Sequence, residues 1–167
     1  YLILPGFSIT SRNRVMSIIL QSRVPMSELD NRAVALTSAS ATSVVLLRIL
    51  LELRNDVSPR FFVYEQGVED PSGQADAILT IGDLALKKSK TPDFPYVYDL
   101  GEAWHEFTGL PFVFALWQVN YKKNIDKELS VLYDILVQSK AHGQSHLREL
   151  ARENASRFGV PAETLIE

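Results

Sequence analysis

Short apolar runs bounded by turn residues recur along most of the chain. Runs of about four to eight residues with Gly, Pro or Ser at their ends are typical of β-strands. The last of these runs follows Pro111, is apolar throughout and predicts a central strand covered on both faces. The predicted strands are 1–4, with a turn at Pro5-Gly6, and then 15–20, 33–37, 61–64, 77–81, 96–98 and 112–117.

Longer apolar runs and helical spacing predict the helices. Residues 44–53 are apolar nearly all round and too long for a typical strand, so they predict a buried helix with Ser40 as its N-cap. Residues 100–108 predict a helix that ends at Gly109. Spacing of three and four residues predicts two more helices, carried by Ile125, Leu129, Leu132 and Leu136, and then by Leu147, Leu150 and Phe158. Strands alternate with helices, which indicates an α/β fold with a mixed, mostly parallel sheet flanked by helices.

Both ends of the sequence lead us to expect truncation. The 167 residues open on Tyr1 without an initiator Met, and Pro161 begins a helix about one turn before the last residue. The formal charge of −3 argues against a nucleic-acid partner, and the longest apolar run is shorter than a membrane span. The absence of cysteine excludes disulfides and thiolate chemistry, and it agrees with a cytoplasmic location.

The strongest candidate site is a hydroxyl-rich turn between a predicted strand and the helix after it. A helix N-terminus offers free backbone N–H groups and a positive dipole end, which suit a carboxylate or phosphate ligand. An N-cap alone needs one hydroxyl, whereas five of the seven residues from 37 to 43 are Ser or Thr. The candidate ligand-binding residues of this turn are Ser38, Ser40, Ala41, Thr42 and Ser43.

Two further polar segments are candidates. The segment 8–17 holds Ser11 and Ser17 beside two arginines that could clamp a carboxylate, or that could simply be solvated. Gly82 and Asp83 follow a buried strand, so Asp83 could face a ligand or cap the next helix.

One histidine pair has the spacing of two metal ligands but lacks the other features of a metal site. His142 and His146 have the i, i+4 spacing of two ligands on one helix face. Gly143 between them should break the helix, and no third ligand is evident, so we expect no metal site and histidines at a surface corner.

Five motifs follow one another along the chain. They are Leu4-Pro5-Gly6-Phe7-Ser8-Ile9 with Val15-x-Ser17, Thr37-Ser38-Ala39-Ser40-Ala41-Thr42-Ser43, Ile81-Gly82-Asp83-x-Ala85-Leu86, Asp99-Leu100-Gly101-Glu102-x-Trp104, and Thr108-Gly109-Leu110-Pro111-Phe112-Val113-Phe114-Ala115-x-Trp117. Together these motifs resemble the chorismate dehydratases of the futalosine route to menaquinone, in the same order and over essentially the whole chain. The resemblance departs at Asn13-Arg14, where the family usually has Gly and a small or cyclic residue.

The resemblance implies a type II-like periplasmic-binding-protein fold, in which two lobes form a clamshell around a ligand cleft. Residues 1–16 would end the first lobe and make the first hinge crossing. Residues 17–80 would form the second lobe, and 81–167 would cross back near 81–83 and return to the first lobe. Ser11, Ser17, the hydroxyl-rich turn and Gly82-Asp83 would then converge on the cleft.

The resemblance also implies a reaction, the loss of water from chorismate to give an aromatic enolpyruvyl benzoate. Aromatisation drives this step, so no cofactor is expected, and the partner is a small-molecule carboxylate. The matched motifs contain no evident base. The proton acceptor is therefore either in an N-terminal segment outside this chain or the substrate's own side-chain carboxylate. The sequence leaves a homodimer open.

Three other functions stay open. The sister enzyme of the same pathway acts on cyclic dehypoxanthinyl futalosine, but it would be expected to carry a Thr-Thr-Ala type turn and a histidine in the cleft. A solute-binding protein for a small carboxylate would use the same clamshell without chemistry. A regulatory ligand-binding domain would need an attached DNA-binding module.

Overall fold

The computed structural model describes residues 1–120 and 126–166. The chain divides into two compact units, one formed by Thr10–Phe114 and the other by Tyr1–Ile9 together with Ala115–Glu167. Among the described residues, no helix combines the length and the apolar character needed to cross a membrane.

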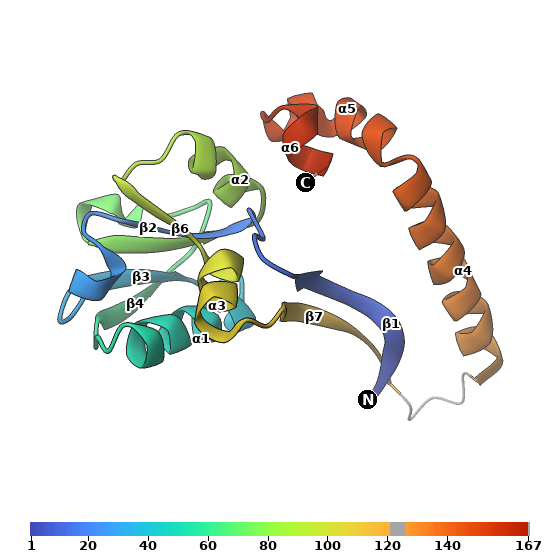
Figure 1. Ribbon diagram of the computed structural model, residues 1–167, viewed down its shortest axis with the longest axis horizontal. Helices are drawn as coiled ribbons and strands as arrows, with labels where there is room; N and C mark the ends of the chain where they lie inside the picture. Colours follow the sequence, from blue (N-terminus) through green and yellow to red (C-terminus); the bar gives the residue numbers. More distant parts are fainter. Residues whose placement is uncertain (121–125, 167) are drawn as a thin grey trace. The chain divides into compact units, whose positions relative to one another are not determined.

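The larger unit is built on a five-stranded mixed sheet with the strand order β4-β3-β5-β2-β6 (Figure 1). β3 runs parallel to β4 and β5, whereas β2 runs antiparallel to β5 and β6. The predicted α/β class is therefore confirmed. The strands are β2 (Ile18–Ser22), β3 (Ala33–Thr37), β4 (Arg60–Tyr64), β5 (Ala77–Ile81) and β6 (Tyr96–Asp99).

Three helices cover this sheet. α1 (Ala41–Ile49) begins after Ser40, as predicted, and continues as one π-helical segment, Leu50–Arg54. α3 (Leu100–Thr108) has the predicted bounds and ends at Gly109, whose φ of 71° is the left-handed conformation that glycine adopts without strain. The third is α2 (Gly82–Lys90), and short 3-10 turns lie at Met26–Glu28 and Pro71–Gly73.

Strand alternation gives the sheet two different faces. One face carries the main core, in which Leu20, Leu36 and Leu79 pack with leucines of α1 and α3. The opposite face carries a smaller cluster that includes Tyr64 and Ile78.

The second unit contains the strands β1 (Leu2–Ser11) and β7 (Phe112–Val119), which pair with each other and continue into the larger unit. Its helices are α4 (Asp126–Ser145), α5 (Leu147–Phe158) and α6 (Ala162–Ile166). The predicted turn at Pro5-Gly6 is wrong, because β1 runs through both residues, as Pro can within a strand that is not central.

The prediction that 112–117 forms a covered central strand is also wrong. β7 pairs with β1 in a two-stranded sheet, and Trp117 is 48% exposed. A continuous apolar run is compatible with burial of a strand on both faces. For β7, however, the described residues do not include the neighbouring elements that would bury both faces.

The larger compact unit continues to Phe114. The lobe boundaries that the resemblance implies, with crossings near 11–17 and 81–83, stay a prediction. β6 pairs with β2, and Leu100 of α3 lies in the main core, so hydrogen bonds and packing hold both elements in the larger unit. The two-lobed clamshell itself stays a prediction.

Candidate functional site

The three polar segments singled out from the sequence meet at one edge of the five-stranded sheet (Figure 1). β2 begins at this edge, because Ile18 pairs with Ile81, the last residue of β5. β3 runs parallel to β5 and therefore also ends at this edge, where it continues into the hydroxyl-rich turn. Ligands of open α/β sheets bind beyond the carboxyl ends of the strands, so this edge is the candidate site.

The hydroxyl-rich turn forms the N-terminus of α1. The Ser40 Oγ accepts a hydrogen bond from the Ser43 N–H at 3.2 Å and donates to the Ser43 Oγ at 2.9 Å. Ser43 is buried, whereas Ser38, Ala41 and Thr42 are exposed. The first N–H groups of a helix have no acceptor within the helix, so those of Ala41 and Thr42 can meet a ligand at this edge. The turn therefore combines an N-cap with exposed donors.

The segment 11–17 is held in place by Asp99, which is 7% exposed. Its carboxylate accepts hydrogen bonds from the Val15 N–H at 3.0 and 3.1 Å and from the Met16 N–H at 2.6 Å. The same carboxylate caps α3 by accepting from the Gly101 and Glu102 N–H groups at 2.9 and 3.1 Å. One buried side chain thus joins the start of a helix to the predicted ligand-binding loop.

Sequence reasoning missed the role of Asp99. The residue stood in a motif quoted for the family resemblance, and an Asp three residues before a Glu is a capping-box pattern. That pattern predicts the cap of α3, but the contact with Val15 joins positions 84 residues apart and has no local signal.

Gly101 is required by the close approach of the same loop. A Cβ atom on Gly101 would lie 2.5 Å from the Asn13 carbonyl oxygen and 2.6 Å from the Ser11 Oγ.

Replacement of Gly101 by Ala is therefore expected to destabilise the protein by about 1–3 kcal/mol, the usual cost of overpacking against a fixed backbone. Gly143 lies in α4 with open space around it, so Gly143→Ala is the matched control and should leave the melting temperature equal or higher. Equal melting temperatures for Gly101→Ala and wild type would contradict this prediction and show that the loop can shift away from the added methyl group at little cost.

Ser11 and Ser17 take different positions in this loop. Ser11 is 8% exposed, and its hydroxyl donates to the Asn13 carbonyl at 3.0 Å, so it stabilises the loop from inside. The Ser17 carbonyl accepts the Gly82 N–H at 2.7 Å, which joins two of the predicted segments directly. Arg14 pairs with Glu102 at 3.8 Å, and both side chains are well exposed, so this ion pair contributes little stability.

Gly82 and Asp83 open α2 without a side-chain cap. Gly82 has a φ of 64°, and Ile81 stands at the N-cap position with no side-chain hydrogen bond to the helix. Asp83 is therefore not the cap, and its exposed carboxylate lies in the first turn at the sheet edge.

Gln66 is a second residue that sequence reasoning missed. Its Nε2 donates to the Ile81 carbonyl and its Oε1 accepts the Ile81 N–H, both at 2.9 Å. The side chain thus takes the place of a strand neighbour at the end of β5 and fixes the backbone next to Gly82. A loop glutamine gives no sequence signal for such a role.

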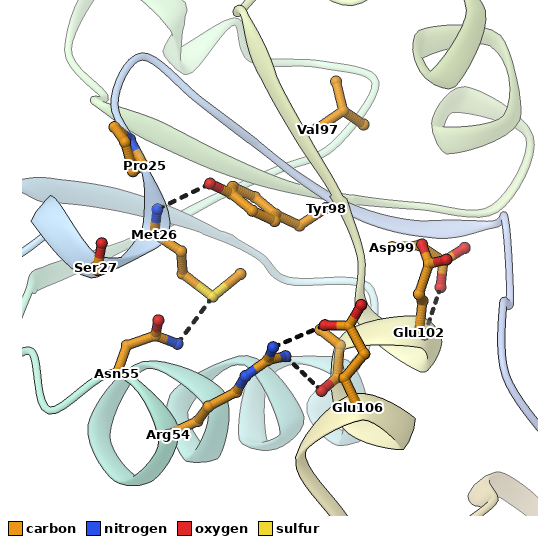
Figure 2. Close-up of a pocket in the computed structure, with 11 residues that line it drawn as sticks. Pro25, Met26, Ser27, Arg54, Asn55, Val97, Tyr98, Asp99, Glu102 and Glu106 are labelled. Carbon is orange, nitrogen blue, oxygen red and sulfur yellow. Dashed lines mark hydrogen bonds and ion pairs between the residues drawn. The ribbon is translucent and has the colours of Figure 1, made fainter. Parts of the chain in front are cut away.

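A cavity of about 200 Å³ lies on the other side of Asp99, beside α3 (Figure 2). Its polar groups are engaged with one another. Arg54 donates to the Ala103 carbonyl at 2.6 Å and pairs with Glu106 at 2.7 Å, and the Met26 N–H donates to the Tyr98 hydroxyl at 3.0 Å (Figure 2). This cavity therefore has fewer polar groups available to a ligand than the sheet edge has.

The histidine pair lies in the smaller unit, where α4 continues through Gly143 to Ser145, so the predicted break at Gly143 is wrong. The rings of His142 and His146 stack with centroids 4.1 Å apart. Across the described part of the chain, no group of three or more His, Cys, Asp or Glu side chains could hold a metal ion.

The fold and the edge define an α/β protein with a site suited to a small anion. The family model described as menaquinone biosynthesis matches residues 1–167, and the chain belongs to that family. It is 35% identical over 173 residues to a chorismate dehydratase of Thermus thermophilus, covering 95% of this chain and 61% of that protein. It is 30% identical over 121 residues to a chorismate dehydratase of Campylobacter jejuni, covering 72% of this chain and 40% of that protein.

The chain thus spans less than two thirds of the length of these two relatives. Among solved structures, it is similar to the second substrate-binding domain of a putative amino acid ABC transporter from Streptococcus pneumoniae. That match has a TM-score of 0.40 and 14% sequence identity, and it covers 83% of this chain and 66% of the other.

Proposed function

We propose that the full-length protein is a chorismate dehydratase, a hydro-lyase that acts on a small dicarboxylate without a cofactor. The observation that carries the proposal is the meeting of the hydroxyl-rich turn, the 11–17 loop and Gly82-Asp83 at one sheet edge. The two relatives described above support it, because both are chorismate dehydratases.

The reaction removes a proton from the ring carbon that bears the enolpyruvyl ether and the hydroxyl from its neighbour. Hydroxide and proton leave together as water, the ring becomes aromatic, and no electrons are exchanged with another molecule. Negative charge develops toward the ring carboxylate as the proton leaves. Preorganised donors at that carboxylate therefore lower the barrier.

The N-terminus of α1 is the group we assign to that carboxylate. The N–H groups of the exposed residues Ala41 and Thr42 and the hydroxyl of Thr42 can donate to it, and the helix dipole has its positive end there. The Ser40 hydroxyl donates to Ser43 and holds the cap. Ser38 and Ser17 complete the wall of the site, whereas the buried Ser11 and Ser43 support it from within.

The proton acceptor is, in this proposal, the substrate's own side-chain carboxylate. Two carboxylates near the edge are already engaged, Asp99 with backbone N–H groups and Glu102 with Arg14. Asp83, a third carboxylate at this edge, is assigned to another role below, and the substrate would bring its own base into the site.

Asp83 is assigned to the ring hydroxyl of the substrate, because a carboxylate accepts a hydrogen bond from a hydroxyl but repels another carboxylate. Asp83→Asn keeps an acceptor oxygen and should change kcat/KM by less than about tenfold, the range of one hydrogen bond. Steady-state kinetics with chorismate measure this change. A loss of several orders of magnitude would show that Asp83 is itself the base.

Incubation of the full-length protein with chorismate tests the function. The expected result is loss of chorismate and stoichiometric appearance of the aromatic enolpyruvyl benzoate, followed by absorbance and mass. Tight chorismate binding without turnover would contradict the proposal and favour the solute carrier.

A further inference from the structure

The strand β4 (Arg60–Tyr64) forms one edge of the five-stranded sheet, and among the described strands it pairs with β3 alone (Figure 1). An open edge presents unpaired backbone groups to another strand, and natural proteins usually block it with charge, proline or a bulge. The middle of β4, Phe61-Phe62-Val63, is apolar and keeps a regular register with β3. This edge is therefore open to pairing with a further strand.

The hydrogen bonds to β3 show which backbone groups of β4 face outward. The Arg60 N–H and the Tyr64 carbonyl both bond to the backbone at the two ends of β3, at 2.8 and 3.0 Å. Every second residue of a strand in a parallel pair turns its N–H and C=O toward the neighbouring strand. The even-numbered residues of β4 therefore face β3, whereas the N–H and C=O groups of Phe61 and Val63 point away from the sheet.

These outward groups are complementary to themselves in one antiparallel register. A two-fold axis beside Phe62 would place Phe61 of one copy opposite Val63 of the other, and each residue would then have partners for both its N–H and its C=O. Shifted registers do less well. They would set Val63 opposite Pro59, which has no N–H, or Phe61 opposite Glu65, whose N–H is already bonded to a side-chain carboxylate.

The side chains at this edge suit the same arrangement. Val63 is 68% exposed and points to the face that carries the main core, as Phe61 does. The Arg48 guanidinium lies over the Phe61 ring at 4.6 Å, and Val45, one turn earlier on the same side of α1, is 55% exposed. Apolar surface therefore extends from β4 onto α1, and a second copy would cover it with the same residues.

Charge complementarity favours the antiparallel arrangement. Arg60 and Glu65 lie at opposite ends of β4, both are exposed, and within the described part of the chain neither forms an ion pair. Across the two-fold axis, Arg60 of each copy would lie close to Glu65 of the other. A parallel pairing would instead bring like charges together at both ends. Such charges at the rim of an interface set orientation more than affinity.

We propose that the free edge of β4 is a homodimer interface, at which two copies of the protein join their five-stranded sheets into one continuous sheet. A second copy is the occupant because the backbone groups, the apolar residues and the charges of this edge are all complementary to themselves about one two-fold axis. The proposal does not rest on the dehydratase function.

Sedimentation velocity of the full-length protein tests the interface. The wild type should be a dimer at micromolar concentration. Val63→Lys would put a charge into the pair with Phe61, beside Arg48, and should raise the dimer dissociation constant at least about 10²-fold. Because Val63 is exposed in a single copy, the variant should keep the wild-type circular dichroism spectrum. Val97→Lys, at a 37% exposed position in the other edge strand, β6, is the matched control and should remain a dimer.

Cysteine cross-linking tests the register. Residues 1–167 contain no cysteine, and any cysteine elsewhere in the full-length protein is first replaced by serine. The two copies of Phe62 would form a pair without hydrogen bonds, with Cα atoms about 4.5 Å apart, which a disulfide can bridge. Phe62→Cys should therefore form a disulfide-linked dimer on mild oxidation. Val63→Cys is the matched control, because its Cα atoms would be about 8–9 Å apart and should cross-link much less.

Several results would overturn the proposal. They are a wild-type protein that stays monomeric up to its solubility limit, a folded Val63→Lys protein with wild-type dimer affinity, and loss of the dimer in Val97→Lys instead. Stronger cross-linking through Val63→Cys than through a folded Phe62→Cys would overturn the register and with it the proposed pairing. If Phe62→Cys does not fold, sedimentation of the two lysine variants decides.

Discussion

Asp99→Ala is expected to lower kcat/KM for chorismate by about 10²-fold, because it releases the loop that carries Ser17 and abuts Gly82. A displacement of a site by about 1 Å is enough for a loss of that size. The variant also loses the α3 cap, and removal of an N-cap costs about 1 kcal/mol. The hydrogen bonds to Val15 and Met16 are charge-assisted and contribute about 1.5–3 kcal/mol each. A marked fall in melting temperature should therefore accompany the kinetic loss.

Asp99→Asn separates the cap from the loop contact. One amide oxygen can still accept from Gly101 and Glu102, as Oδ1 does now. The amide nitrogen would replace the oxygen that accepts the Met16 N–H at 2.6 Å, and two donors would then face each other. The helix should stay capped while the loop loses the Met16 bond and keeps only the Val15 N–H bond to Oδ1, so KM should rise with a smaller fall in melting temperature than in Asp99→Ala.

Kinetics and thermal melting of both variants check this prediction. Asp70 offers the matched control, because it also caps a short helix, accepting the Ser72 N–H at 2.9 Å, and it lies outside the sheet edge. Asp70→Asn should keep wild-type kcat/KM. An Asp99→Asn protein with wild-type KM would show that the loop contact does not position the site.

The double replacement Ser40→Gly with Thr42→Val is expected to lower kcat/KM by about 10-fold to 10²-fold. Loss of the Thr42 hydroxyl would remove a hydrogen bond to a charged carboxylate, and such a bond contributes about 1.5–3 kcal/mol. Loss of the Ser40 hydroxyl removes the bonds that hold the turn to Ser43. Gly at the N-cap costs only a few tenths of a kcal/mol, and Val has nearly the shape of Thr, so α1 should still form. The kinetic loss then reports on chemistry rather than on folding.

Steady-state kinetics and chorismate affinity measure this effect. Thr91→Ala is the control, because the exposed Thr91 hydroxyl donates to the Lys87 carbonyl at the end of α2, away from the edge. It should behave as wild type. Unchanged kinetics in the double variant would remove the hydroxyl-rich turn from the site.

Local signals account for what the sequence could predict. The Ser40 cap, the buried strand 77–81 and the end of α3 at Gly109 each depend on residues within a few positions, and the structure confirms all three. The strand-end rule placed the hydroxyl-rich turn, whereas the convergence of the three polar segments was implied only by the family resemblance.

Contacts distant in sequence account for what it could not predict. Asp99 reaches back to Val15, and Gln66 occupies the place of a strand beside Ile81. The same limit explains β7, whose apolar residues could not reveal that β1 is its partner in a two-stranded sheet. The pairing of β6 with β2 likewise carries no local pattern.

The most direct measurement of the central claim is an NMR amide map of the full-length protein with the enolpyruvyl benzoate bound. The account predicts the largest shifts at the Ala41 and Thr42 N–H groups, with smaller ones at Ser17 and Gly82. Shifts confined to residues away from this edge, such as Tyr98 and Arg54, would contradict the assignment of the sheet edge as the substrate site.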